Sequence, residues 1–181
     1  MRRRLPNIRT NSLVVSVSVP VAPAAGTLTV AGVMGNEYEK NQHERLADKL
    51  GYDYAWEVEH HFLEEYSHSP APESFLAAAS QRTKQIRLGH GIVQLTTNHP
   101  ARVAERIASL DLLSNGRVEM GMGESASITE LEPFNVTMEN KREIFEEAVR
   151  AIIPMFKDGP SEHHGKHFDM PLRMVVPKPL Q

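Results

Sequence analysis

Apolar residues along this chain recur with two alternating periods, one typical of strands and one typical of helices. Short apolar or alternating runs predict strands over 54–58, 86–95 and 117–122. Between and after them, apolar residues three and four positions apart predict helices over 36–50, 72–83, 101–113 and 138–156, with a short helical piece at 129–134. Such alternation, with short connections, is typical of βαβ units and a parallel sheet.

Within three of these helices, the spacing of apolar side chains predicts the buried face. Asn36 can cap the first helix, and Gly51 can end it. The predicted apolar faces are Leu46 and Leu50 in the first helix, Val103, Ile107, Leu110 and Leu113 (or Leu112) in the third, and Ile144, Phe145, Ala148, Ile152 and Met155 in the last.

The two ends of the chain are less regular. Leu13–Val19 alternates Val with Ser, and Thr27–Val33 predicts a second short strand in a stretch rich in Pro, Ala and Gly. Three arginines before this apolar stretch resemble a secretion signal, but Ser16, Ser18 and Pro20 interrupt it. We therefore expect residues 1–35 to be a poorly ordered leader with a degraded first strand, and residues 36–181 to form one domain.

At the C-terminal end, residues 163–181 predict a loop with an extended pair at 167–170 and 172–176. His163, His164 and His167 lie in this segment. We interpret them as solvated loop residues in preference to a metal site, because clustered histidines are common on loop surfaces.

Composition excludes several classes of function. The chain has 181 residues and a net charge of -3, so we expect no nucleic-acid binding. It has no cysteine, which excludes disulfides, zinc-thiolate sites and thiol catalysis and is typical of a cytoplasmic protein. No apolar run reaches about eighteen residues, so no membrane-spanning helix is predicted.

Polar or glycine-rich segments follow three predicted strands, at the ends where parallel sheets gather functional groups. They are Glu59-His60-His61, the segment from Gly91 to Gln94 with Thr96, and Gly123-Glu124-Ser125. We therefore expect all three segments to lie at one edge of the sheet.

The chemistry of Glu59-His60-His61 remains open from residue types alone. A carboxylate beside an imidazole is typical of general acid-base catalysis. The same residues could bind a metal with His68, although neighbouring strand residues point to opposite faces. The third interpretation is a buried structural histidine.

Glycines near the other two strand ends are equally ambiguous. Gly121 and Gly123 indicate close approach of the backbone to a ligand or to a helix. His90-Gly91 indicates a bulge, a flat ligand against the backbone, or a barrel-interior position that accepts only a small residue.

Five segments in order resemble the luciferase-like monooxygenase family, which contains bacterial luciferase. They are Glu59–Phe62, Ala71–Glu73, Thr83–Gly89, Asn98–Glu105 and Leu110–Val118, within roughly residues 40–180. The resemblance implies an α/β fold, a (βα)8 TIM barrel with parallel strands. It also implies reduced FMN, supplied by a flavin reductase, or in some branches a deazaflavin. Dioxygen would then oxidise a small-molecule substrate.

The resemblance also assigns roles to the strand ends. His60 matches the active-site histidine and Glu59 the carboxylate beside it, which makes both candidate catalytic residues. Cofactor-binding candidates are His60, Gly91, Ile92, Gln94, Gly123 and Glu124. Gly91–Ile92 matches a non-prolyl cis peptide under the isoalloxazine ring. No metal ligand is implied.

Two departures from the family modify this expectation. Glu124 stands where many relatives carry Arg, and Glu would repel a phosphate. The chain is also shorter than the roughly 250 residues of such a barrel. We expect the N-terminal half of a barrel, with about four βα units. Alone, this half should bind flavin weakly or not at all. The alternatives are a deazaflavin-dependent oxidoreductase and a non-catalytic half-barrel that pairs with a partner chain or forms a dimer.

Overall fold

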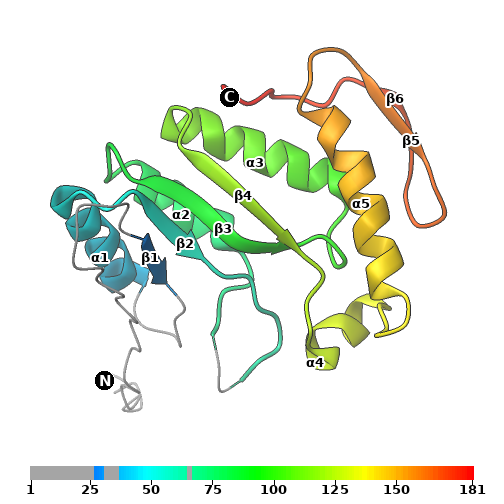
Figure 1. Cartoon of the computed structure of the whole chain (residues 1–181), viewed down its shortest axis with the longest axis horizontal. Helices are drawn as coiled ribbons and strands as arrows, with labels where there is room; N and C mark the ends of the chain where they lie inside the picture. The colour runs from blue at the N-terminus through cyan, green and yellow to red at the C-terminus, as the bar shows by residue number, and fades with distance from the viewer. Residues whose placement is uncertain (1–26, 31–36, 65–66) are drawn as a thin grey trace, which may run out of the picture.

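The computed structural model describes residues 27–30, 37–64 and 67–181. A parallel sheet contains β1 (Thr27–Val30), β2 (Tyr54–Glu57), β3 (Arg87–Gln94) and β4 (Val118–Gly123), in chain order from one edge to the other (Figure 1). β1 confirms part of the strand predicted at Thr27–Val33, whereas the prediction for Leu13–Val19 lies outside the described residues. The predicted alternation of strands and helices is therefore confirmed from residue 37 onward.

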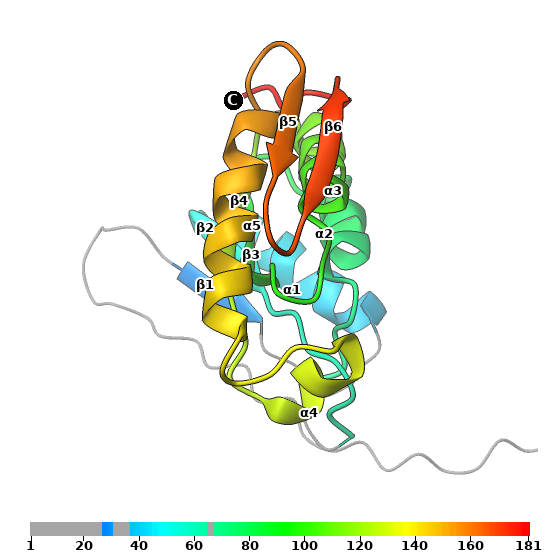
Figure 2. The ribbon, with the colours of Figure 1, turned by 90° about the vertical axis from the view of Figure 1, so that its right-hand side faces the viewer.

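Three helices cover the same side of this sheet: α1 (Glu37–Leu50), α2 (Pro72–Ser80) and α3 (Pro100–Ser114) (Figure 2). After β4 the chain forms a short helix, α4 (Ile128–Leu131), and a 3-10 turn, η1 (Glu132–Phe134). α5 (Lys141–Met155) then packs against α3. This order leaves the ends of β2, β3 and β4 close to the α4 segment.

The main core lies between the sheet and these helices. Val103, Ile107 and Leu110 of α3 are buried, as predicted, but Leu113 is 56% exposed and its predicted burial is wrong. On α5, Ile144, Ala148, Ile152 and Met155 are buried, and Phe145 packs against the core while partly exposed. The helical period therefore identified most of both apolar faces and failed near the end of α3.

α1 turns a polar face toward the protein, so the predicted burial of Leu46 and Leu50 is wrong. These leucines are 53% and 66% exposed, whereas Ala47 and Asp48 are buried. The Asp48 carboxylate accepts hydrogen bonds from the backbone N–H groups of 84–86, at 2.7–3.0 Å. This carboxylate fixes the face that α1 presents to the start of β3. Gly51, with φ +80°, ends the helix as predicted.

β3 contains a bulge at Gly91–Ile92, where the pairing with β4 shifts register and the peptide bond is cis. The bulge predicted at His90-Gly91 and the cis peptide are therefore both confirmed. A Cβ on Gly121 would contact the carbonyl oxygen of His90, and one on Gly123 would lie 2.6 Å from Cδ1 of Ile92. The close approach that the structure shows for Gly121 and Gly123 is therefore to the neighbouring strand, and approach of a ligand to Gly123 stays a prediction.

The segment after α5 is an antiparallel hairpin of β5 (Ser161–His164) and β6 (Asp169–Arg173). The predicted extended pair is confirmed in part, because β6 overlaps both predicted segments, but β6 pairs with β5, which lies before them in the chain. The carboxylate of Glu147 on α5 accepts N–H bonds from His167 and Phe168 at 2.8–3.1 Å and contacts Nε2 of His163 at 3.3 Å. Two of the three histidines predicted as solvated are therefore mostly buried against α5, and only His164 is well exposed.

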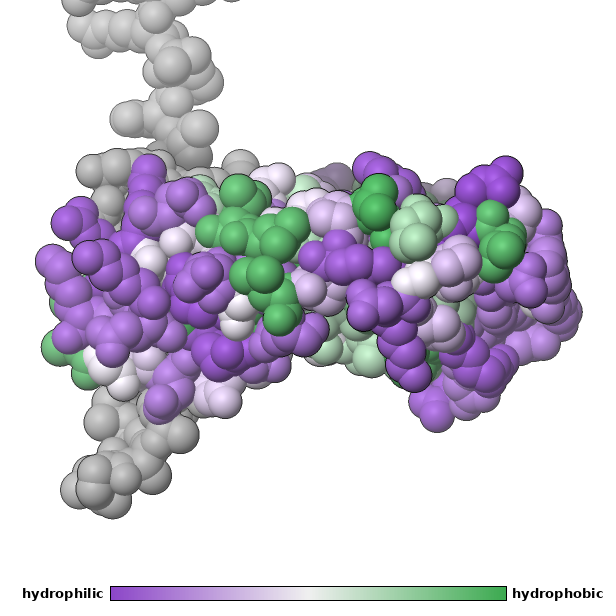
Figure 3. Space-filling model, turned by 90° about the horizontal axis from the view of Figure 1, so that it is seen from above, coloured by the Kyte–Doolittle hydropathy of each residue, from purple (hydrophilic) through white to green (hydrophobic). Residues whose placement is uncertain are grey.

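Seen from above, the surface is mainly hydrophilic, with separate apolar patches among polar side chains (Figure 3). Within the ranges that the structure describes, no helix combines the length and the apolar character that crossing a membrane requires.

Candidate functional site

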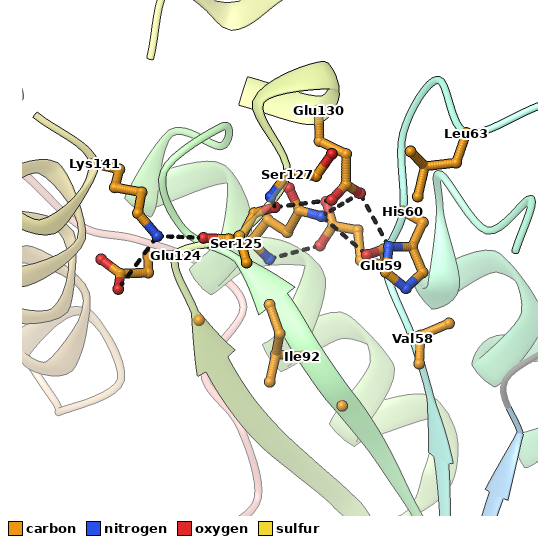
Figure 4. Close-up of a pocket in the computed structure, with 14 residues that line it drawn as sticks. Val58, Glu59, His60, Leu63, Ile92, Glu124, Ser125, Ser127, Glu130 and Lys141 are labelled. Atoms are coloured by element: carbon orange, nitrogen blue, oxygen red, sulfur yellow. Dashed lines mark hydrogen bonds and ion pairs between the residues drawn. The ribbon is translucent and has the colours of Figure 1, made fainter. Parts of the chain in front are cut away.

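A pocket of about 580 Å³ lies at the carboxyl ends of β2, β3 and β4 (Figure 4). The strand-end residues predicted to act in catalysis or cofactor binding all line it: Glu59, His60, Gly91, Ile92, Gln94, Gly123 and Glu124. The structure therefore brings together all of the predicted site residues. Pocket-lining residues that sequence reasoning missed include Glu130 and Lys141.

His60 is held in the pocket wall by a carboxylate from the α4 segment. Its Nδ1 lies 3.0 Å from Oε1 of Glu130, and its side chain is 23% exposed. Its backbone N–H donates to the carbonyl of Ser69. With Glu130 ionised, Nδ1 of His60 carries the proton that is donated, so Nε2 of the neutral ring holds the lone pair.

Glu130 is the hydrogen-bond centre of this wall. It is buried, and it accepts bonds from the backbone N–H of His61 (3.0 Å), Nε2 of Gln94 (2.9 Å) and Oγ of Ser125 (2.8 Å), besides its contact with His60. Burial acts to raise the pKa of Glu130, but these donors, the His61 N–H foremost, outweigh it and hold the pKa below its ordinary value. Glu130 is therefore a fixed anion beside His60.

Glu59 does not pair with His60 but with His61. Its Oε1 lies 3.0 Å from Nε2 of His61 and accepts from Nδ2 of Asn98 at 3.0 Å. Its Oε2 accepts from the backbone N–H of Gln94 at 2.9 Å. Residues 59 and 61 thus face one way, as strand alternation requires, while His60 faces Glu130. The acid-base pair expected from adjacent residues is replaced by two separate carboxylate-imidazole pairs.

Between these two carboxylates, Gln94 lies with its side chain almost fully buried. Its Nε2 donates to the backbone carbonyl of Glu59 and to Glu130. Its Oε1 is buried and has no hydrogen-bond partner among the described residues. The side-chain nitrogen thus holds Gln94 between the two carboxylates, and Oε1 is a buried acceptor.

The opposite end of the pocket carries a loose ion pair (Figure 4). Nζ of Lys141 donates to the carbonyl of Ser125 at 2.7 Å and lies 3.6 Å from Oε1 of Glu124. Among the lining residues that the structure describes, Lys141 is the one Lys or Arg side chain. Lys141 thus supplies positive charge beside a position where an arginine was expected and glutamate is found.

The metal-binding alternative is not supported. Nε2 of His68 bonds to the carbonyl of Glu64 in an exposed position. Within the described ranges, His, Asp and Glu side chains form no group of three or more that could hold a metal ion.

The chain that forms this pocket is similar to proteins of one known family. The sequence profile of luciferase-like monooxygenases matches residues 25–181. The oxygenase component of the flavin-dependent trigonelline monooxygenase of Acinetobacter baylyi is 32% identical over 139 residues, which are 76% of this chain and 38% of the relative. The F420-dependent glucose-6-phosphate dehydrogenase of Amycolatopsis mediterranei is 35% identical over 89 residues, which are 47% of this chain and 26% of that enzyme.

Solved structures give the same result for the fold. The monooxygenase RslO1 of Streptomyces bottropensis superposes with a TM-score of 0.77 at 32% identity, covering 80% of this chain and 44% of RslO1. The oxygenating constituent of 3,6-diketocamphane monooxygenase from Pseudomonas putida, in complex with FMN, gives 0.69 at 26% identity, covering 74% and 37%.

The chain spans less than half the length of the curated relatives that it matches. The family includes both flavin-dependent and F420-dependent enzymes. Since the profile match extends over most of the chain, this protein belongs to the luciferase-like monooxygenase family.

Proposed function

We propose that this chain forms the cofactor-binding half of a flavin-dependent monooxygenase. In this proposal, a reductase supplies reduced FMN, and dioxygen oxidises a small organic substrate. The observation that carries it is the gathering of all predicted strand-end residues around one pocket. In this proposal the fold comprises about four βα units of a TIM barrel. The protein acts in the cytoplasm.

The residues present fit an isoalloxazine ring. The volume, about 580 Å³, lies within the range of pockets that hold cofactors. Gly91 and Ile92 line the pocket and would present backbone and an apolar side chain to the ring. When bound, the reduced flavin would supply the electrons that activate dioxygen.

His60 is the residue to which we assign proton transfer in this site. Its bond to Glu130 fixes the ring orientation and keeps one proton on Nδ1, so that Nε2 is the nitrogen that accepts and returns a proton. Glu130 also stabilises the imidazolium that forms when Nε2 accepts a proton, because a buried anion lies at 3.0 Å from the other ring nitrogen. Glu59 would orient the strand end through His61, Asn98 and Gln94.

A deazaflavin-dependent oxidoreductase is the second candidate, and the F420-dependent relatives support it. The ring-binding residues would serve either cofactor. The difference lies in the reaction, because hydride transfer to or from a deazaflavin consumes no dioxygen.

Because the chain covers less than half of its relatives, we propose that this chain alone binds flavin weakly. A further barrel half, a partner chain or a second copy would be needed for tight binding. The third candidate is a non-catalytic half-barrel that pairs with a partner chain or with a second copy.

The test is an NMR titration of the purified chain with FMN and, separately, with F420. We expect weak binding, with shifts concentrated at the amides of 59–61, 91–94 and 123–125. Absence of shifts in this set with either ligand, at millimolar concentration, contradicts the proposed site. Tight stoichiometric binding contradicts the need for a further half. Oxygen consumption that tracks turnover would favour the monooxygenase over the deazaflavin enzyme.

A further inference from the structure

His90 is a buried imidazole that the proposed chemistry does not use. It points from β3 into the layer between the sheet and the helices α2 and α3 and is 2% exposed. Burial lowers its pKa to about 4, against the opposing charges of Glu73 and Glu59. The ring is therefore neutral at pH 7 and must have one donor and one acceptor nitrogen.

The two ring nitrogens have different surroundings. The backbone of Glu119 interacts with the ring, whereas Nδ1 has no hydrogen-bond partner among the described residues. We assign the proton of the neutral ring to Nε2, which leaves Nδ1 as a buried acceptor. A buried acceptor without a donor costs about 1–3 kcal/mol, so a donor is expected at this point.

A small cavity lies beside His90. Its volume is about 10 Å³, and its polar wall consists of Glu59, Glu73, His90 and Arg106, with three apolar side chains completing it. A volume on the order of 10–15 Å³ holds one water, provided that two to four polar partners are present. Both conditions are met here.

The polar wall connects two surfaces of the protein. Glu59 also lines the candidate functional site, and Glu73 lines a groove of about 330 Å³ between α2 and α3. Nη1 of Arg106 donates to Glu73 at 2.7 Å, and its Nη2 donates to Oδ1 of Asn98 at 2.6 Å. Since Asn98 donates in turn to Glu59, these side chains frame the cavity from the pocket to the outer groove.

We propose that this cavity is a binding site for one structural water, which donates one proton to Nδ1 of His90 and the other to the carboxylate of Glu73. A lone pair of this water can accept from Arg106. Because Arg106 and Asn98 connect Glu73 to Glu59, His90 and Glu73 are then positioning residues for Glu59. The water site itself does not depend on the proposed function, which only gives Glu59 its importance.

The first test uses the wild-type chain with 15N-labelled histidine. We expect a neutral His90 at pH 7 with the proton on Nε2, an Nδ1 shift typical of a hydrogen-bonded acceptor, and cross-relaxation between its ring protons and a long-lived water. An Nδ1-protonated ring, or a ring without a water contact, overturns the proposal. Absence of flavin binding would leave this result unchanged, so the two proposals fail separately.

The second test is a double-mutant cycle of His90→Phe with Glu73→Gln, measured by urea unfolding at pH 7. Because His90 is neutral at that pH, its direct electrostatic coupling to Glu73 is small, and coupling reports the shared water. We expect the effects on the unfolding equilibrium constant to differ from additivity by about fivefold.

The matched control replaces Glu105, a neighbour in the same groove that pairs with Arg102 and does not line the cavity. His90→Phe and Glu105→Gln should be additive. Additivity of His90→Phe with Glu73→Gln would overturn the proposal. Should these variants not fold, the wild-type NMR experiment decides alone.

Discussion

Oε1 of Glu130 lies 3.0 Å from Nδ1 of His60, although 70 positions separate the two residues in the chain. The contact joins the end of β2 to the short helix that follows β4. The contact fixes the orientation of the His60 ring, because the other hydrogen bonds of Glu130 hold its carboxylate in place.

Replacement of Glu130 by Gln should loosen His60 and destabilise the fold. The amide retains the shape but gives charge-neutral bonds to several buried donors, so we expect a loss of about 1–3 kcal/mol in the free energy of unfolding. Urea denaturation at pH 7 measures it. Glu132→Gln, on an exposed neighbouring position, should change stability little. Equal effects of both variants would contradict a central role for Glu130.

His90 should make stability fall as the pH is lowered from neutrality. Its folded pKa, about 4, lies below the ordinary value of 6.5, so between these values the unfolded chain binds the proton and the folded chain does not. Stability is complete above pH 6.5 and falls by about 3 kcal/mol as the pH approaches 4. Urea unfolding at several pH values should show this slope in the wild type.

The His90→Phe variant isolates that slope. A phenyl ring fills similar space without titrating, so its stability should be flatter between pH 6.5 and 4.5. Glu130 acts at lower pH: its folded pKa is below its unfolded value, so its contribution is present above the latter and lost as the pH falls through the former. An unchanged slope above pH 4.5 would contradict a buried neutral His90.

Alanine at Gly121 should be more disruptive than alanine at Gly91. A Cβ on Gly121 would meet a backbone carbonyl, which cannot move without breaking the β3–β4 pairing. A Cβ on Gly91 would approach the side chain of Trp56, with Cβ of Trp56 nearest at 3.3 Å. We expect about 1–3 kcal/mol for Gly121→Ala and less for Gly91→Ala. Thermal unfolding of the two variants provides the comparison, and the reverse order would contradict the described packing.

The Glu124–Lys141 pair should determine how tightly the pocket binds the phosphate group of FMN. Lys141→Met should weaken FMN binding by about fivefold and leave riboflavin binding unchanged, because only FMN carries the anionic group. Glu124→Gln should strengthen FMN binding selectively, since it removes a repelling charge near Lys141. NMR-detected titrations with both flavins measure the ratio. Parallel changes for FMN and riboflavin would show that the phosphate binds elsewhere.

The strand ends could be predicted from the sequence because polar residues there interrupt otherwise apolar runs. Glu59, His60 and Gln94 stand out for this reason, and the parallel order of β2, β3 and β4 brings them together. Glu130 could not be found in the same way. It belongs to a short helix outside the regular alternation, and its importance arises from donors on three other segments. The nearest signal was the predicted helical piece at 129–134, directly after a polar strand end.

The wrong predictions of burial in the first helix and of exposure in the C-terminal segment have a common physical cause. Periodicity reports where apolar residues could be buried, but a buried carboxylate can determine orientation instead. Asp48 fixes α1 against the start of β3, which leaves Leu46 exposed. Glu147 binds the hairpin backbone, which draws histidines out of solvent. Neither carboxylate lies at a position that an apolar pattern marks.

The bulge in β3 also changes which residues of the strand lie on the same face of the sheet. Two residues, Gly91 and Ile92, stand opposite Gly121 alone, so the alternation of side chains changes from even to odd at this point. His90 and Val93 consequently both face the helices, and Gln94 faces the pocket. Deleting one of these two residues would therefore restore regular alternation and leave Val93 and Gln94 on their present faces. Sequence comparisons across this family should therefore be aligned separately on either side of Ile92.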